Sequence, residues 1–214
     1  MVVFLSIIEV PTHSGPLPAK YNYLTHTSSS SSLAILFPGK AYPLDAPVMW
    51  YSAKAAFDAG CDVLGVEYGY QANRIDFDMD NLEYVIDEAA EALNKVLMTG
   101  KYSNVVLIGK SIGTLVQTKV LSKVSFQIRN HVFLTPLRPT IPAIREAENA
   151  LVVVGDSDSS FGASDIAQIT GLSGVKISIV PGADHGLETI DYRNSIDILK
   201  QVAILCGDFC REPR

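Results

Sequence analysis

Six short apolar runs alternate with segments of helical character along the chain, and this alternation constrains the fold more than any other feature. The runs are rich in β-branched residues, and they cover residues 33–37, 62–67, 104–108, 131–134, 150–154 and 176–180. Strands buried on both faces have this composition, whereas strands with one face in water alternate between apolar and polar residues. Helices that connect consecutive strands make the strands parallel and lie on both faces of the sheet. The sequence therefore predicts an α/β fold.

Between the apolar runs, the sequence predicts helices over residues 45–60, 80–100, 112–122, 140–148, 163–170 and 189–206. The clearest is 80–100, because its apolar residues recur on one face of a helix. Asp80 with Glu83 resembles a capping box at its start. Asp45 is the candidate cap of the helix over 45–60, and Pro47 suits the first turn of that helix.

The first 32 residues have a different pattern. Residues 2–10 and 20–25 are strand-like, and the stretch between them contains prolines and a glycine, as expected for an antiparallel pair at the edge of the sheet. The serine run over 28–32 is too short to link two domains. A chain of 214 residues can bury one core without a disulfide or a metal. We therefore predict one domain over residues 1–214.

Composition excludes several classes of partner. The chain has 17 basic and 23 acidic residues, for a net charge of −6, so it lacks a basic surface for nucleic acid or anionic membranes.

The chain has no apolar run of 18 residues, and residues 1–10 include Glu9 and lack the charged leader of a signal peptide. The three cysteines, Cys61, Cys206 and Cys210, match no zinc pattern and suit a reducing compartment. We expect a cytoplasmic protein without a metal or a cofactor.

The predicted strand over 104–108 leads directly into a Gly-x-Ser-x-Gly pattern centred on Ser111, and a helical segment follows. A sharp turn that lifts a serine above a sheet needs small residues two positions on either side, here Gly109 and Gly113. A phosphate-binding loop would need glycine at Asn104, and a dinucleotide fingerprint would need glycine at Ser111 and at Thr114. The pattern therefore favours a nucleophilic serine over a phosphate site, although a turn that merely contains glycines has the same appearance.

A serine hydroxyl needs a base to take its proton and an acid to orient that base. Of the four histidines, His13, His26 and His131 precede the candidate strand ends or lie within an apolar run, whereas His185 follows the last predicted strand on a glycine-rich loop. We expect His185 to be the base. The acid should follow the strand over 150–154, where Asp156 and Asp158 are both candidates.

The order Ser111, acid, His185, each just beyond a predicted strand, resembles the α/β-hydrolase superfamily. That family often has Gly-x-x-Asp in its acid loop, which favours Asp158 because Gly155 stands three residues before it. The resemblance also implies an oxyanion hole made by the backbone N–H groups of Lys40 and Ile112. Here Pro38 and Gly39 stand where the family often has histidine and glycine, and Glu67–Gly69 resembles the family's turn after its fourth strand.

Only fifteen residues separate the runs that end at Leu134 and begin at Ala150, too few for a lid. The chain thus resembles the small, lidless hydrolases similar to dienelactone hydrolase, although those typically carry cysteine as nucleophile. The resemblance implies a serine hydrolase that cleaves a small ester or thioester through an acyl-enzyme on Ser111. A catalytically silent domain that binds a ligand or partner, and an acyltransferase, are the alternatives.

The expected partner is a small-molecule acyl substrate, and a homodimer stays open. Lys40 and Lys110 flank the predicted site and could attract an anionic substrate. We expect instead that both side chains point to solvent, as most lysines do.

Overall fold

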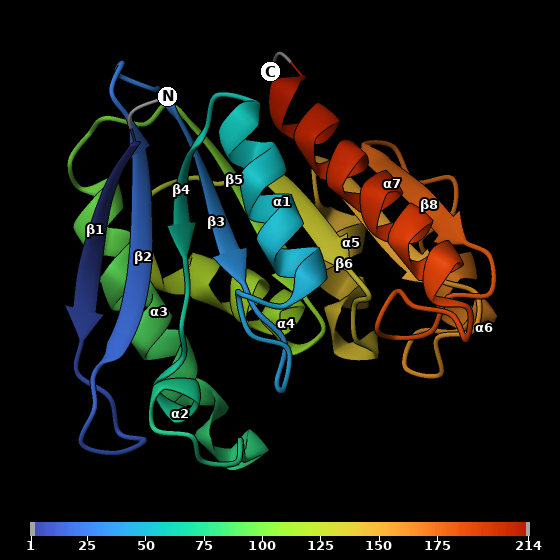
Figure 1. Cartoon of the computed structure of the whole chain (residues 1–214), viewed down its shortest axis with the longest axis horizontal. Helices are drawn as coiled ribbons and strands as arrows, with labels where there is room; N and C mark the ends of the chain where they lie inside the picture. Colours follow the sequence, from blue (N-terminus) through green and yellow to red (C-terminus); the bar gives the residue numbers. More distant parts are fainter. Residues whose placement is uncertain (1–2, 213–214) are drawn as a thin grey trace.

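The computed structural model describes residues 3–212 as one twisted sheet of eight strands flanked by helices (Figure 1). Residues 1, 2, 213 and 214 lie outside this range, and with them the predicted start of the first strand at Val2. The strands are β1 (Val3–Val10), β2 (Ala19–His26), β3 (Ser32–Phe37), β4 (Asp62–Gly65), β5 (Asn104–Lys110), β6 (Asn130–Leu134), β7 (Asn149–Gly155) and β8 (Val175–Val180). Their order in the sheet is β1-β2-β4-β3-β5-β6-β7-β8.

The sheet is parallel from β4 to β8, and β1 and β2 form an antiparallel pair at its edge, with β2 antiparallel to β4. The helices are α1 (Pro47–Asp58), α2 (Gly69–Ala72), α3 (Leu82–Leu97), α4 (Ile112–Lys119), α5 (Ile141–Glu146), α6 (Ala163–Ala167) and α7 (Tyr192–Arg211). The predicted α/β class, with a mostly parallel sheet and helices on both faces, is confirmed.

Two apolar layers enclose the sheet. Helices α1 and α7 lie side by side on one face, and α3, α4, α5 and α6 cover the other (Figure 1). In β3, Leu33, Ile35 and Phe37 pack in the layer of α3 and α4, whereas Ala34 and Leu36 pack in the layer of α1 and α7. Successive side chains of a strand point to opposite faces, so burial of both faces explains the continuous apolar runs.

The starts of two helices differ from the prediction. The Asp80–Glu83 capping box is wrong, because α3 begins at Leu82 after a short 3₁₀ turn, and Asp78 accepts a hydrogen bond from the N–H of Asp80. Asp45 does not cap α1 either; the N–H of Val48 donates to the Tyr42 hydroxyl at 3.1 Å. The acceptors are thus the Tyr42 hydroxyl at the start of α1 and Asp78 at the 3₁₀ turn before α3, rather than Asp45 and Asp80.

The connection from β6 to β7 contains a 3₁₀ turn (Arg138–Thr140) and α5, and no lid domain covers the sheet there. The short helix α2 was not predicted, because four residues are too few to show a helical period. It follows β4 at the carboxyl end of the parallel strands, the edge at which open sheets of this class bind ligands. Among the described helices, none is both long and apolar enough to cross a membrane.

Candidate active site

The carboxyl ends of three parallel strands bring Ser111, Asp158 and His185 to the same edge of the sheet. Ser111 follows β5, Asp158 follows β7 by three residues, and His185 lies on the loop between β8 and α7. Because the carboxyl ends of parallel strands face one way, side chains far apart in the sequence can meet there.

Ser111 occupies a strained turn between β5 and α4. Its φ of 54° and ψ of −119° lie in a region that residues with a side chain rarely adopt. A Cβ on Gly113 would lie 2.0 Å from the carbonyl oxygen of Phe37, and one on Gly109 would lie 2.4 Å from the Gln117 side chain. The two glycines are therefore needed because β3 and α4 pack directly against the turn.

The imidazole of His185 lies between the serine and the aspartate. Its Nε2 is 2.8 Å from Ser111 Oγ, and its Nδ1 is 2.8 Å from Asp158 Oδ2. The Asp158 side chain is fully buried, whereas the His185 side chain is 32% exposed. The second carboxylate oxygen of Asp158 accepts a hydrogen bond from the N–H of Ser160 at 2.7 Å, which fixes the carboxylate in place.

Burial by itself would raise the pKa of Asp158. Hydrogen bonds from His185 and from the N–H of Ser160, with the nearby charge of Lys110, outweigh burial and hold this pKa below its usual value. At neutral pH Asp158 is therefore an ionised acceptor. Such an acceptor keeps the proton of the neutral imidazole on Nδ1 and leaves Nε2 able to accept the Ser111 proton.

Asp156, the alternative acid, points elsewhere. Its Oδ1 accepts hydrogen bonds from the N–H of Gly182 at 2.7 Å and from the Ser157 hydroxyl at 3.2 Å. Asp156 thus joins the loop after β7 to the loop that carries His185, while Asp158 contacts the imidazole. The structure brings Asp158 to His185 and leaves Asp156 exposed.

The other three histidines lie away from Ser111. The His13 ring packs against the Tyr84 ring at a tilt, and His131 is buried within β6. His26 Nδ1 lies 3.1 Å from the Oδ1 of Asp62, the first residue of β4. This contact is at the opposite edge of the sheet from the carboxyl ends of the parallel strands.

Lys110 corrects one expectation. Its side chain is buried, and its Nζ donates to the Thr135 hydroxyl at 3.0 Å and to the backbone carbonyl of His185 at 2.7 Å. It also lies 4.6 Å from the centre of the Tyr42 ring. Burial lowers the pKa of this ammonium to about 8. Lys110 therefore links the strand before Ser111 to the His185 loop, whereas the Lys40 side chain is exposed as expected.

The turn after β3 lies directly against the serine. A Cβ placed on Gly39 would be 3.6 Å from the Cβ of Ser111 and 3.7 Å from the Lys110 carbonyl oxygen. The backbone N–H of Lys40 belongs to this turn. The N–H of Ile112 is the first of α4, and a helix leaves its first N–H groups without intrahelical acceptors.

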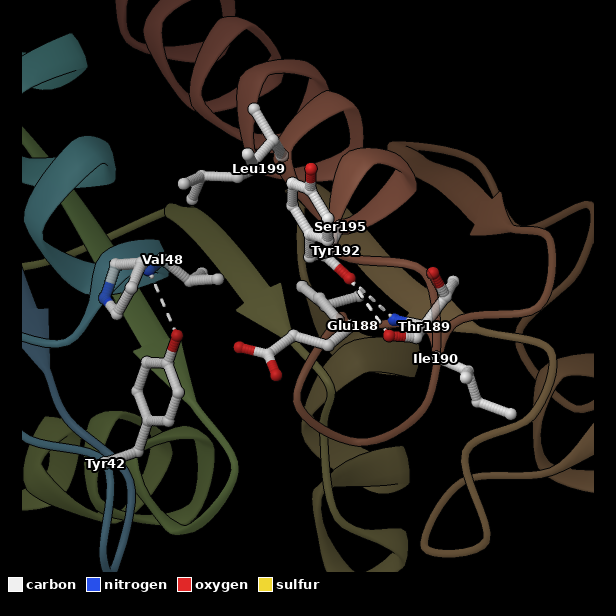
Figure 2. Close-up of a pocket in the computed structure, with 11 residues that line it drawn as sticks. Tyr42, Val48, Glu188, Thr189, Ile190, Tyr192, Ser195 and Leu199 are labelled. Carbon is white, nitrogen blue, oxygen red and sulfur yellow. Dashed lines mark hydrogen bonds between the residues drawn. The ribbon is translucent and has the colours of Figure 1, made fainter.

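A pocket of about 280 Å³ opens beside the His185 loop (Figure 2). The loop supplies Leu187, Glu188, Thr189 and Ile190 to the pocket lining. The wall near α1 consists of Tyr42, Pro47 and Val48, and the wall near α7 consists of Tyr192, Ser195, Ile196 and Leu199. Figure 2 shows the Glu188 carboxylate extending into the space between the two sides. The Thr189 N–H donates to the Ser195 hydroxyl at 2.9 Å, which fixes the loop to the start of α7. The pocket is small and mainly apolar, with one acidic side chain.

Within residues 3–212, no group of three or more His, Cys, Asp or Glu side chains is arranged to hold a metal ion. Ser111, His185 and Asp158 have the side-chain types and the hydrogen-bond order of a nucleophile, a base and an acid that orients the base.

No protein-family model matches the sequence, and no curated protein matches it significantly. Solved structures do match the fold. An α/β serine hydrolase homologue from Coxiella burnetii has a TM-score of 0.70 and 15% identity, covering 92% of this chain and 95% of its own. A serine hydrolase without a lid from Xanthomonas campestris has a TM-score of 0.67 and 15% identity, covering 92% and 91%. An esterase from Pyrococcus furiosus has a TM-score of 0.71 and 14% identity, covering 96% and 89%. The chain therefore has the α/β-hydrolase fold in its lidless form.

Proposed function

We propose that this protein is a serine hydrolase that cleaves a small ester or thioester through an acyl-enzyme on Ser111. The observation that carries the proposal is the continuous hydrogen-bonded path from Ser111 through His185 to Asp158, with 2.8 Å at each contact. A serine on a strained turn, a histidine within hydrogen-bond reach and a buried carboxylate are the groups that acyl transfer by serine requires.

In this mechanism His185 takes the proton of Ser111 as the serine oxygen attacks the carbonyl carbon of the substrate. Asp158 holds the imidazole in place and stabilises its protonated form. The N–H groups of Lys40 and Ile112 donate to the oxyanion of the tetrahedral intermediate. When the intermediate collapses, His185 gives its proton to the leaving alcohol or thiol. Water, activated by the same imidazole, then attacks the acyl-enzyme and releases the acid.

The size of the pocket beside the His185 loop supports a small substrate. Pockets for drug-sized ligands usually hold about 300–1,000 Å³, and this one, at about 280 Å³, suits a short apolar chain. The fold neighbours include an esterase, which favours an ester. We assign the acyl chain or a short alkyl leaving group to this pocket.

A fluorophosphonate probe tests the nucleophile directly. We expect the unaltered protein to be labelled and to hydrolyse short p-nitrophenyl esters, and both activities to disappear in Ser111→Ala. The matched control is Ser122→Ala, because Ser122 is exposed on a 3₁₀ turn and its hydroxyl donates to the Lys119 carbonyl. The control should keep both activities. Absence of labelling in the folded, unaltered protein would favour a catalytically silent domain.

A further inference from the structure

Three consecutive carbonyl groups of the turn after β3 each accept a hydrogen bond from one short segment, Tyr68 and the first residues of α2. The pairs are Tyr68 Oη with Pro38 O at 3.3 Å, Gln71 Nε2 with Gly39 O at 3.0 Å, and Tyr70 Oη with Lys40 O at 3.1 Å. Burial raises the pKa of both tyrosine hydroxyls, so they remain protonated donors. The turn that lies against Ser111 is thus held from one side by a single element.

The central pair sets the direction of one particular N–H. A trans peptide group is planar, and its C=O and N–H point in opposite directions. The Gly39 carbonyl and the Lys40 N–H belong to the same peptide group. When Gln71 holds the carbonyl on its own side, the Lys40 N–H must point away from Gln71. Gly39 itself packs against Ser111.

The Gln71 side chain is in turn fixed. Its Oε1 accepts a hydrogen bond from the N–H of Tyr68 at 3.3 Å, so its amide nitrogen is the group turned toward Gly39. The start of α2 is also anchored, because the N–H of Gly69 donates to Glu88 on α3 at 3.0 Å, and Glu88 is buried. The donor to the Gly39 carbonyl is therefore preorganised rather than a mobile surface side chain.

We propose that Gln71 is a positioning residue that orients the Lys40 N–H toward the oxyanion formed at Ser111. The inference rests on the proposed hydrolase function and adds a residue outside the Ser111, His185 and Asp158 set. Tyr68 and Tyr70 hold the neighbouring peptide groups, whose N–H groups belong to Gly39 and Ala41. Among the side chains of residues 3–212, Gln71 is the one that bonds the peptide group that contains the proposed oxyanion donor. On the backbone, Gly39 also pairs with Tyr42 in an isolated antiparallel bridge.

The test is the variant Gln71→Met, which keeps the length of the side chain and removes the donor. Loss of one oxyanion-hole donor costs about 10²–10³ in kcat. We expect loss of its orientation to lower kcat for p-nitrophenyl acetate by about ten- to hundredfold, with KM nearly unchanged. Affinity for trifluoroacetone, which adds to a nucleophilic serine as a tetrahedral oxyanion, should fall in parallel.

Asn73→Ala is the matched control for a merely structural effect. The Asn73 amide donates to the carbonyls of Leu17 and Gly69, so the substitution loosens α2 without removing a bond to the turn at 38–40. It should keep kcat and ketone affinity, and both variants should melt cooperatively.

The outcomes separate the two proposals. Suppose that the unaltered protein hydrolyses the ester and Ser111→Ala does not, while the kcat of Gln71→Met stays within twofold of the kcat of the unaltered protein. The hydrolase function then stands, and the role of Gln71 is wrong. The role is equally wrong if Asn73→Ala loses kcat by the same factor, or if kcat falls while ketone affinity does not. If Ser111→Ala hydrolyses the ester as fast as the unaltered protein, or the unaltered protein hydrolyses none, the function and this inference both fail.

Discussion

At the scale of single residues, two aspartates two positions apart have different surroundings. Asp158 is buried against His185, whereas Asp156 is exposed and holds the N–H of Gly182. We expect Asp158→Asn to lower kcat for a p-nitrophenyl ester by about 10⁴-fold, because an amide no longer fixes the proton on Nδ1. Asp156→Asn should change kcat by a few-fold at most. The reverse pattern of kcat values would show that Asp156 is the acid.

Lys110 makes stability depend on pH in a defined direction. Its pKa in the folded chain is about 8, whereas a lysine of the unfolded chain titrates near about 10.4. Between these values the unfolded chain binds more protons, so the free energy of unfolding rises with pH. We expect this lysine to add about 2 kcal/mol between about pH 7.5 and about pH 9.5.

Urea denaturation of the unaltered protein and of Lys110→Met at both pH values measures this contribution. The variant should lack the rise, and the other titrating groups cancel because both chains share them. Equal pH dependence in the two chains would mean that the Lys110 ammonium is not buried as described.

The same residues show what the sequence could and could not predict about the site. Ser111 and His185 could be selected because each follows an apolar run and has small neighbours, and these are local features. The choice between Asp156 and Asp158 depended on a family pattern, since both follow the same strand. The burial of Lys110 had no local signal, because its acceptor is a carbonyl 75 residues away. Gln71 was missed because its partner is 32 residues away, across the sheet edge.

At the scale of elements, the turn from β5 to α4 depends on close packing with β3. A Cβ on Gly113 would lie 2.0 Å from the Phe37 carbonyl oxygen, and backbone cannot move aside cheaply. Gly113→Ala should therefore lower the free energy of unfolding by about 3 kcal/mol or prevent folding. Gly162→Ala is the control, because no atom lies within 4 Å of its added Cβ and its φ is −91°. Chemical denaturation of both variants makes the comparison, and equal stabilities would contradict the packing.

The start of α7 forms one wall of the pocket beside the His185 loop. Ile196 is exposed and lines this wall, whereas Ile204 is exposed farther along the same helix and does not. We expect Ile196→Trp to fill part of the pocket and to shift the preference toward shorter acyl chains, chiefly through a higher KM for longer p-nitrophenyl esters. Ile204→Trp should leave the chain-length profile unchanged. The same shift in both variants would remove this pocket from the substrate-binding site.

Element boundaries were less predictable than element types. The strands of the parallel part were recognisable because both of their faces are buried, which produces an unbroken apolar run. The start of α1 was not, because the Tyr42 hydroxyl supplies the acceptor instead of Asp45. The start of α3 was not either, because a 3₁₀ turn capped by Asp78 precedes it. Several residue types near a helix start can cap it, and tertiary packing decides which does.

At the scale of the whole molecule, apolar layers cover both faces of the sheet, and Ser111, Asp158 and His185 lie at the carboxyl ends of its parallel strands. The turn after β3, the Ser111 turn, the loop after β7 and the His185 loop all meet at that edge. Lys110 and Gln71 donate hydrogen bonds, and Asp156 accepts one, that tie these four segments to one another or to their neighbours. The central claim is that this edge forms an acyl-enzyme on one serine.

Mass spectrometry of the protein quenched in acid during turnover of p-nitrophenyl acetate tests that claim most directly. The account predicts one acetyl group on the peptide that contains Ser111, and neither an adduct nor turnover in Ser111→Ala. An acetyl group on another residue during turnover, or undiminished hydrolysis by Ser111→Ala, would contradict it.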